Sequence, residues 1–141
     1  MTYTIEWIVP DHLLVIHLEG LVTPAVVAAS ADDMYQRLFE CHEKSNDLVH
    51  FIIDSANASM GKQVREYMSI PFKRSPNTGW VIITGTSGLM RMIMSVFSAL
   101  IPGGMQFTAM SNVAEAVTFL SKRDLAIASF ISTHQPLSSD H

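Results

Sequence analysis

Cysteine is nearly absent from the sequence, and its scarcity excludes several classes of protein. Cys41 is the single cysteine, so no disulfide can form within the chain. Small secreted domains that depend on disulfides are excluded, and the cytoplasm, a reducing compartment, is the expected location. A thiol nucleophile needs a neighbouring base, and none stands beside Cys41. We expect Cys41 to be a small buried apolar residue on a helix.

Charged residues are also few. They make up 16% of the chain, whereas about 25% is usual for soluble domains. The net charge is −4 and no run of lysine and arginine exceeds two residues, so the clustered cations that bind nucleic-acid phosphates are missing. We expect no nucleic-acid partner. The 48% of hydrophobic residues predicts either a large core or an apolar surface that another subunit covers.

Long apolar segments are absent as well. The longest, residues 89–101, is shorter than the roughly 18 residues that span a membrane, and Arg91 interrupts it. Residues 1–10 show no basic region followed by an apolar run, which argues against a secretory signal peptide there. We expect no integral membrane segment.

What the sequence does contain is an alternation of apolar and amphipathic segments. Residues 3–9 and 12–18 predict two strands that a tight turn joins into a hairpin. The nearly continuous apolar runs over residues 48–53 and 80–83 predict strands covered on both faces, as in the centre of a parallel sheet. A short last strand is predicted over residues 105–110.

Four amphipathic segments predict helices. The first begins at Thr23 and Pro24, because a hydroxyl caps the first turn and proline needs no N–H donor there. The fourth begins at Asn112, with Glu115 three residues later, as in a capping box. The second and third are predicted around residues 60–68 and 89–101, and residues 125–131 could add one or two further turns.

The order of these elements predicts an α/β fold, an open mixed sheet of about five strands with four or five flanking helices. The domain is expected over residues 1–123. Residues 124–141 are expected to form a C-terminal segment that is partly disordered.

Histidines and one aspartate are the residues that could carry chemistry. The six histidines lack the spacing of zinc ligands, so no metal is expected, although His17 and His50 lie in predicted strands and could be neighbours. Asp54 ends a buried strand, where open α/β sheets place functional groups. It could act as a general base, but no nucleophile, second acid or oxyanion donor can be placed beside it. We favour the alternative that Asp54 accepts N–H bonds from its own loop, and we expect no catalytic site.

Two other segments could bind a ligand. Residues 85–88, Gly-Thr-Ser-Gly, join a strand to a helix and could bind an anion there, or could be only a turn and a cap. The helix over residues 89–101 has polar residues on one narrow stripe, so more than one of its sides must be covered. The C-terminal segment, a second subunit or an apolar ligand could cover it, and Met90, Met94 and Phe97 lie on one line for that contact.

The run from residues 52–54 to Ser59, Met60 and Gly61, followed by a helix, resembles the STAS domain superfamily. More narrowly, it is similar to SpoIIAA-like proteins, which are related to CRAL–TRIO-type lipid-binding domains. The resemblance implies an open sheet flanked by helices, no cofactor, and a regulatory or ligand-binding role. In the anti-sigma factor antagonists of this family, an Asp-Ser-Ser-Gly turn carries a phosphorylated serine. Here Ala58, Ser59, Met60 and Gly61 occupy that turn, and methionine cannot be phosphorylated.

The sequence and the resemblance together predict a non-enzymatic SpoIIAA-like module that binds an apolar, lipid-like small molecule or a protein partner, with a homodimer as a further expectation. One alternative is an anti-sigma antagonist that uses Ser55 or Ser59 as a phosphate acceptor. Another is a small hydrolase or isomerase that uses Asp54 and a histidine. The residues expected to contact a ligand or partner are Asp54, Ser59, Met60, Gly61, Ser87, Met90, Met94 and Phe97.

Overall fold

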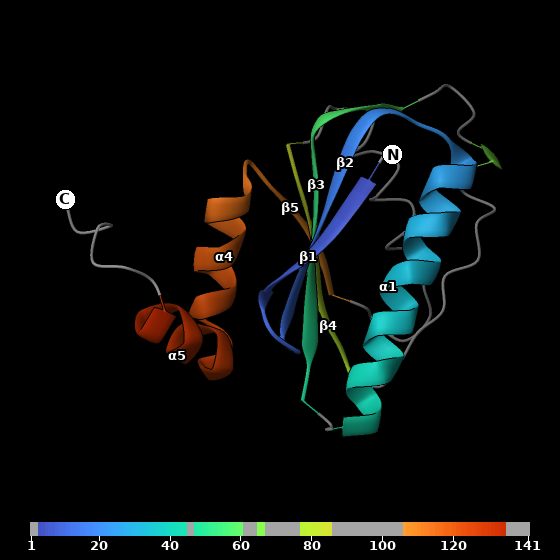
Figure 1. Cartoon of the computed structure of the whole chain (residues 1–141). Helices are drawn as coiled ribbons and strands as arrows, with labels where there is room; N and C mark the ends of the chain where they lie inside the picture. The colour runs from blue at the N-terminus through green and yellow to red at the C-terminus, as the bar shows by residue number, and fades with distance from the viewer. Residues whose placement is uncertain (1–2, 45–46, 61–64, 67–76, 86–105, 135–141) are drawn as a thin grey trace.

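The computed structural model describes residues 3–44, 47–60, 65–66, 77–85 and 106–134. Five strands form one sheet, whose spatial order is the order of the chain (Figure 1). The first strand is antiparallel to the second, and the remaining pairs are parallel. The predicted open mixed sheet is therefore confirmed. The strands are β1 (Tyr3–Val9), β2 (Leu13–Val22), β3 (Val49–Met60), β4 (Thr78–Thr84) and β5 (Gln106–Met110).

Helices cover both faces of the sheet. α1 (Pro24–Lys44) lies on one side, and α4 (Val113–Ser121) and α5 (Leu125–His134) lie on the other (Figure 1). The helical turns predicted over residues 125–131 are thus confirmed as α5. The helices predicted around residues 60–68 and 89–101 fall outside the described residues, except that Arg65 and Glu66 are helical and Met60 belongs to a strand.

The helix starts lie where the sequence places them. The hydroxyl of Thr23 accepts a hydrogen bond from the N–H of Val26 at 3.3 Å, so a hydroxyl caps α1 and Pro24 is its first residue. The side-chain oxygen of Asn112 accepts from the N–H of Glu115 at 2.8 Å, as expected for the cap of α4. Both predicted caps are confirmed.

The core has two layers because strand side chains alternate between the two faces of the sheet. On the α1 side, buried strand residues meet Leu38 and Cys41 of α1. On the opposite side, they meet Ala116 and Leu120 of α4 and Ile127 of α5. The buried strand residues include Leu14, Ile16, Phe51 and Val81 on the α1 side, and Val15, Ile52 and Ile82 on the other.

Two strands are longer than the sequence predicts. β2 was expected to end at residue 18 and β3 at residue 53, but they continue as partners through the pairs Glu19–Asn57 and Val22–Met60. The pairing shifts by one residue between His17 and Glu19, because β3 carries one extra residue there, a β-bulge. We call residues 19–22 and 57–60 the β2–β3 ribbon. Its polar and small residues gave no strand pattern, yet the backbone hydrogen bonds of the ladder hold them extended.

Candidate functional site

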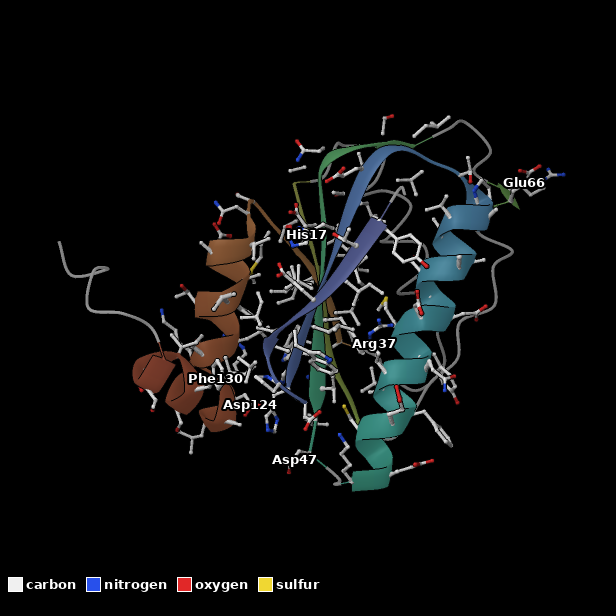
Figure 2. The ribbon with its side chains drawn as sticks, in the orientation of Figure 1. His17, Arg37, Asp47, Glu66, Asp124 and Phe130 are labelled. Atoms are coloured by element: carbon white, nitrogen blue, oxygen red, sulfur yellow. The ribbon has the colours of Figure 1, made fainter. Side chains whose placement is uncertain are left out.

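Three charged side chains meet on the face of the sheet that carries α4 and α5. The ring of His17 lies between two carboxylates, with Nδ1 2.9 Å from Oδ2 of Asp54 and Nε2 2.8 Å from Oε1 of Glu6. The three residues come from β2, β3 and β1 respectively. Figure 2 shows His17 on the sheet, well away from Asp124 beside α5.

The strand register explains why these residues meet. His17 is directly opposite Asp54 in the parallel β2–β3 pair and opposite Thr4 in the antiparallel β1–β2 pair. Glu6 is two residues beyond Thr4 and so points to the same face, within reach of the imidazole. His17 and His50, which the sequence allowed to be neighbours, are not. His50 is opposite Leu13, four residues from His17 along β2 and about 13 Å away.

The two contacts determine the charge of His17. A carboxylate oxygen only accepts hydrogen bonds, so each ring nitrogen must carry a proton for both short contacts to be favourable. Burial alone would lower the pKa of His17, but the hydrogen bonds to Glu6 and Asp54, together with their negative charge, raise it above its ordinary value of 6.5. The ring is therefore favoured as an imidazolium that has no free lone pair.

Asp54 does more than bind the histidine. Its other oxygen, Oδ1, accepts from the N–H of Ala56 at 3.2 Å, which is the local bond predicted for it. That bond spans the bulge inside β3, and the prediction that Asp54 ends the strand is wrong. The hydrolase or isomerase alternative placed a histidine beside Asp54, and the structure shows that His17 is that histidine. The sequence alone does not give the register of β2 against β3 that selects it.

Neighbouring hydroxyls do not complete a nucleophilic site. Ser55 is buried, and its hydroxyl donates to the carbonyl of Thr84 at 2.8 Å. Thr84, the partner of Asp54 on β4, is fully buried, and its hydroxyl has no hydrogen-bond partner in the described structure. Among the residues described, no serine, threonine or cysteine is hydrogen-bonded to His17.

Part of the sheet beside His17 is exposed. α4 packs against β3, β4 and β5, and α5 packs against β1, but the side chains of the β2–β3 ribbon on this face are exposed. Leu21, an apolar residue among them, is 57% exposed. We call the following residues the open face: Glu6, His17, Glu19, Leu21, Asp54, Asn57 and Ser59.

A second histidine–aspartate pair lies toward the other end of the same face. Nε2 of His50 is 2.8 Å from Oδ2 of Asp124, and Nδ1 accepts from the N–H of Trp80 at 2.9 Å. His50 is 2% exposed, and this burial is the largest cause of a lowered pKa. Asp124 also accepts from the N–H of Ala126 at 2.9 Å, so the pair fixes the start of α5 to the sheet.

The remaining expectations have mixed outcomes. Ser59 is exposed on β3, and Met60, which was predicted to belong to a helix around residues 60–68, is the last residue of β3. The other expected contact residues lie outside the described residues: Gly61, Ser87, Met90, Met94 and Phe97. Cys41 is buried on α1 as predicted, and its burial, with a hydrogen bond to Asp11, raises the thiol pKa to about 11. Within the described ranges, no cluster of three histidine, cysteine or carboxylate residues could hold a metal ion. No helix there is long and apolar enough to cross a membrane.

No protein-family model matches this chain, and no curated protein does. Among solved structures, one match is the anti-sigma factor antagonist SpoIIAA in its unphosphorylated form, with 15% identity and a TM-score of 0.49 over 85% of this chain and 97% of that one. Another is an uncharacterized DUF3478 family protein with a SpoIIAA-like fold from Shewanella loihica PV-4, with 18% identity and a TM-score of 0.52 over 84% of this chain and 91% of that one. The second match shows that this chain has the SpoIIAA-like fold, as the sequence resemblance implied.

Proposed function

We propose that this chain is a regulatory module of the STAS type that catalyses no reaction and docks a protein partner on the open face. The SpoIIAA-like fold supports the regulatory class. The cytoplasm, expected from the single cysteine, belongs to the same proposal.

The observation that carries the proposal is the state of His17. It is the group on the open face most suited to act as a general base, but both of its nitrogens contact carboxylates. A base must offer a free lone pair to the proton that it removes. His17 would have to leave one carboxylate first, and its hydrogen bonds favour the form that has no lone pair to offer. The arrangement therefore supports binding over catalysis.

A protein partner is supported by the shape and chemistry of the open face. Strands present flat rows of alternate side chains, and Leu21 supplies an apolar group amid polar and acidic ones. Protein interfaces combine apolar and polar contacts. An extended sheet surface of this kind suits another protein better than a small molecule, which needs a concave pocket.

Affinity capture from the native host tests the proposal. Leu21→Asp replaces the apolar side chain of the open face with a charge and should remove the specifically retained partner. Leu125→Asp is the matched control, because Leu125 is 83% exposed on α5, away from the open face, and should leave retention unchanged. Equal retention by the wild type and both variants, or equal loss from both, would contradict docking on this face.

Native mass spectrometry of the freshly purified protein tests the apolar ligand and the homodimer, which were predicted through Met90, Met94 and Phe97. A bound lipid-like mass that persists in Leu21→Asp would replace the protein-partner proposal with a ligand-binding one. A monomer without added mass would favour docking on the open face.

A phosphorylation switch is the second proposal, and exposure decides which serine it would use. Ser55 is buried and hydrogen-bonded to Thr84, whereas Ser59 is exposed on the open face. A phosphate on Ser59 would add negative charge beside Leu21. Phosphoproteomics of the native host would detect that modification on the Ser59 peptide.

A further inference from the structure

We propose that His17 is a proton-operated switch: protonated, it ties Glu6 of β1 to Asp54 of β3, and its deprotonation releases Glu6 and makes the open face more negative. The ionic link is independent of the proposed function. Only its consequence for partner binding rests on that function.

The geometry requires two protons on the ring. A neutral imidazole has one N–H and one lone pair on opposite sides of the ring. With Glu6 at 2.8 Å from one nitrogen and Asp54 at 2.9 Å from the other, loss of either proton leaves a lone pair facing a carboxylate oxygen. That contact is repulsive, so the neutral ring can keep only one of its two partners.

Glu6 is the partner that is released. The side chain of Glu6 is 63% exposed and that of Asp54 is 21% exposed, so water solvates Glu6 more readily once the bond breaks. Asp54 is also held by the N–H of Ala56 and lies on the third strand of the sheet. Glu6 lies on β1, an edge strand, with one side chain torsion more than aspartate to move away.

The release changes the charge of the open face. That face carries the carboxylates of Glu6, Glu19 and Asp54, and His17 is the single basic group among its members. Glu6 and Asp54 face the ring directly, while Glu19 on β2 and Glu115 at the start of α4 are exposed. When His17 loses its proton, the face loses its positive charge and gains a free carboxylate. A basic partner segment would then bind more tightly as the pH rises.

Nuclear magnetic resonance of labelled protein reads the switch without any partner. Long-range proton–nitrogen spectra should show both ring nitrogens of His17 protonated at mildly acidic pH, with a titration midpoint above that of an ordinary histidine. The side-chain carboxyl carbon of Glu6 should shift with the same midpoint, and the carboxyl carbon of Asp54 should shift less. A titration midpoint of His17 at or below that of an ordinary histidine would overturn the proposal. So would a ring in which a single nitrogen is protonated at every pH.

Two matched variants locate the effect. Glu6→Gln removes a bonded carboxylate and should lower the midpoint of His17. Glu19→Gln removes an exposed carboxylate of the same face that does not bond His17, and should lower it less. Equal midpoints in wild type and Glu6→Gln would contradict the tie to β1. If His17 titrates as expected but affinity capture shows no partner on the open face, the proposed function fails while the switch stands.

Discussion

The pairs His17–Asp54 and His50–Asp124 lie on the same face of one sheet and have nearly equal nitrogen–oxygen distances, 2.9 and 2.8 Å. Their surroundings nevertheless favour opposite charge states. His17 is 31% exposed and has a carboxylate on each side, so the charged ring is favoured. His50 is 2% exposed and accepts a backbone N–H on its second nitrogen, so the neutral ring is favoured. A histidine–aspartate contact alone therefore does not identify a catalytic pair.

The second partner of each ring explains the difference. Because Trp80 donates its N–H to Nδ1 of His50, the proton of the neutral ring must be on Nε2, which donates it to Asp124. His50 thus has one defined tautomer and joins β3, β4 and the start of α5. It stabilises the fold, whereas the link made by His17 can be changed by pH.

The largest expected effect is the loss of His50. His50→Ala leaves the half-buried N–H of Trp80 without its acceptor and opens a cavity, which should cost about 3 kcal/mol of unfolding free energy. His17→Ala removes a partly exposed ionic link and should cost less than about 1 kcal/mol. Urea unfolding of both variants at neutral pH measures the two values. Comparable losses would show that the two pairs do not differ as described.

Gly79 sharpens the comparison from the side of the buried pair. A Cβ at this position would clash with Nδ1 of His50, so Gly79→Ala must displace a ring that is hydrogen-bonded on both sides. We expect a loss of about 2 kcal/mol. The loss should shrink in the His50→Ala background, because the ring that clashes is gone. A double-mutant cycle with equal costs in both backgrounds would contradict this account.

The pH dependence of stability should have opposite signs for the two histidines. The pKa of His17 is raised in the folded state, so its contribution is complete below about pH 6.5 and is lost as the pH rises through the folded value. The pKa of His50 is lowered, so its contribution is complete above about pH 6.5 and is lost as the pH falls toward the folded value. The urea concentration at half-unfolding should be measured from about pH 5 to 8. In wild type it should fall as the pH rises above neutral, and in His17→Gln this fall should be smaller because the contribution of His17 is absent. An unchanged alkaline profile in that variant would count against a charged His17.

The two pairs also mark what the sequence can and cannot predict. The caps at Thr23 and Asn112 were predictable, because each depends on residues three positions apart. The apolar run over residues 48–53, which predicts a buried strand around Ile52, is also local. His50 and Asp124 are 74 residues apart in sequence, and only the docking of α5 on the sheet brings them together.

The site on the open face depends on register in the same way. His17 is opposite Asp54 in the pairing of β2 with β3, and a shift of one residue would place their side chains on opposite faces. The bulge that follows Asp54 is stabilised by the hydroxyl of Ser55 and by close packing of Gly85 on Ala56. Gly85 has a φ of +68°, a backbone conformation that favours glycine. The sequence shows a glycine at this position but not its role in packing against the bulge.

The smallest expected effects come from exchanging each aspartate for asparagine, which keeps the shape and removes the charge. Asp124→Asn retains an oxygen that can accept from Nε2 of neutral His50, so the cost should be about 0.5 kcal/mol, the low end for one hydrogen bond. Asp54→Asn removes half of the charge that surrounds a cationic ring, so its main effect should be on titration. In Asp54→Asn the pKa of His17 should fall toward its ordinary value. In Asp124→Asn the pKa of His50 should stay below its ordinary value, because burial is the main cause of its lowering. Titration of both imidazole rings by nuclear magnetic resonance measures the two pKa changes separately. If His50 gained a proton near neutral pH in Asp124→Asn, its charge state would not be determined by burial.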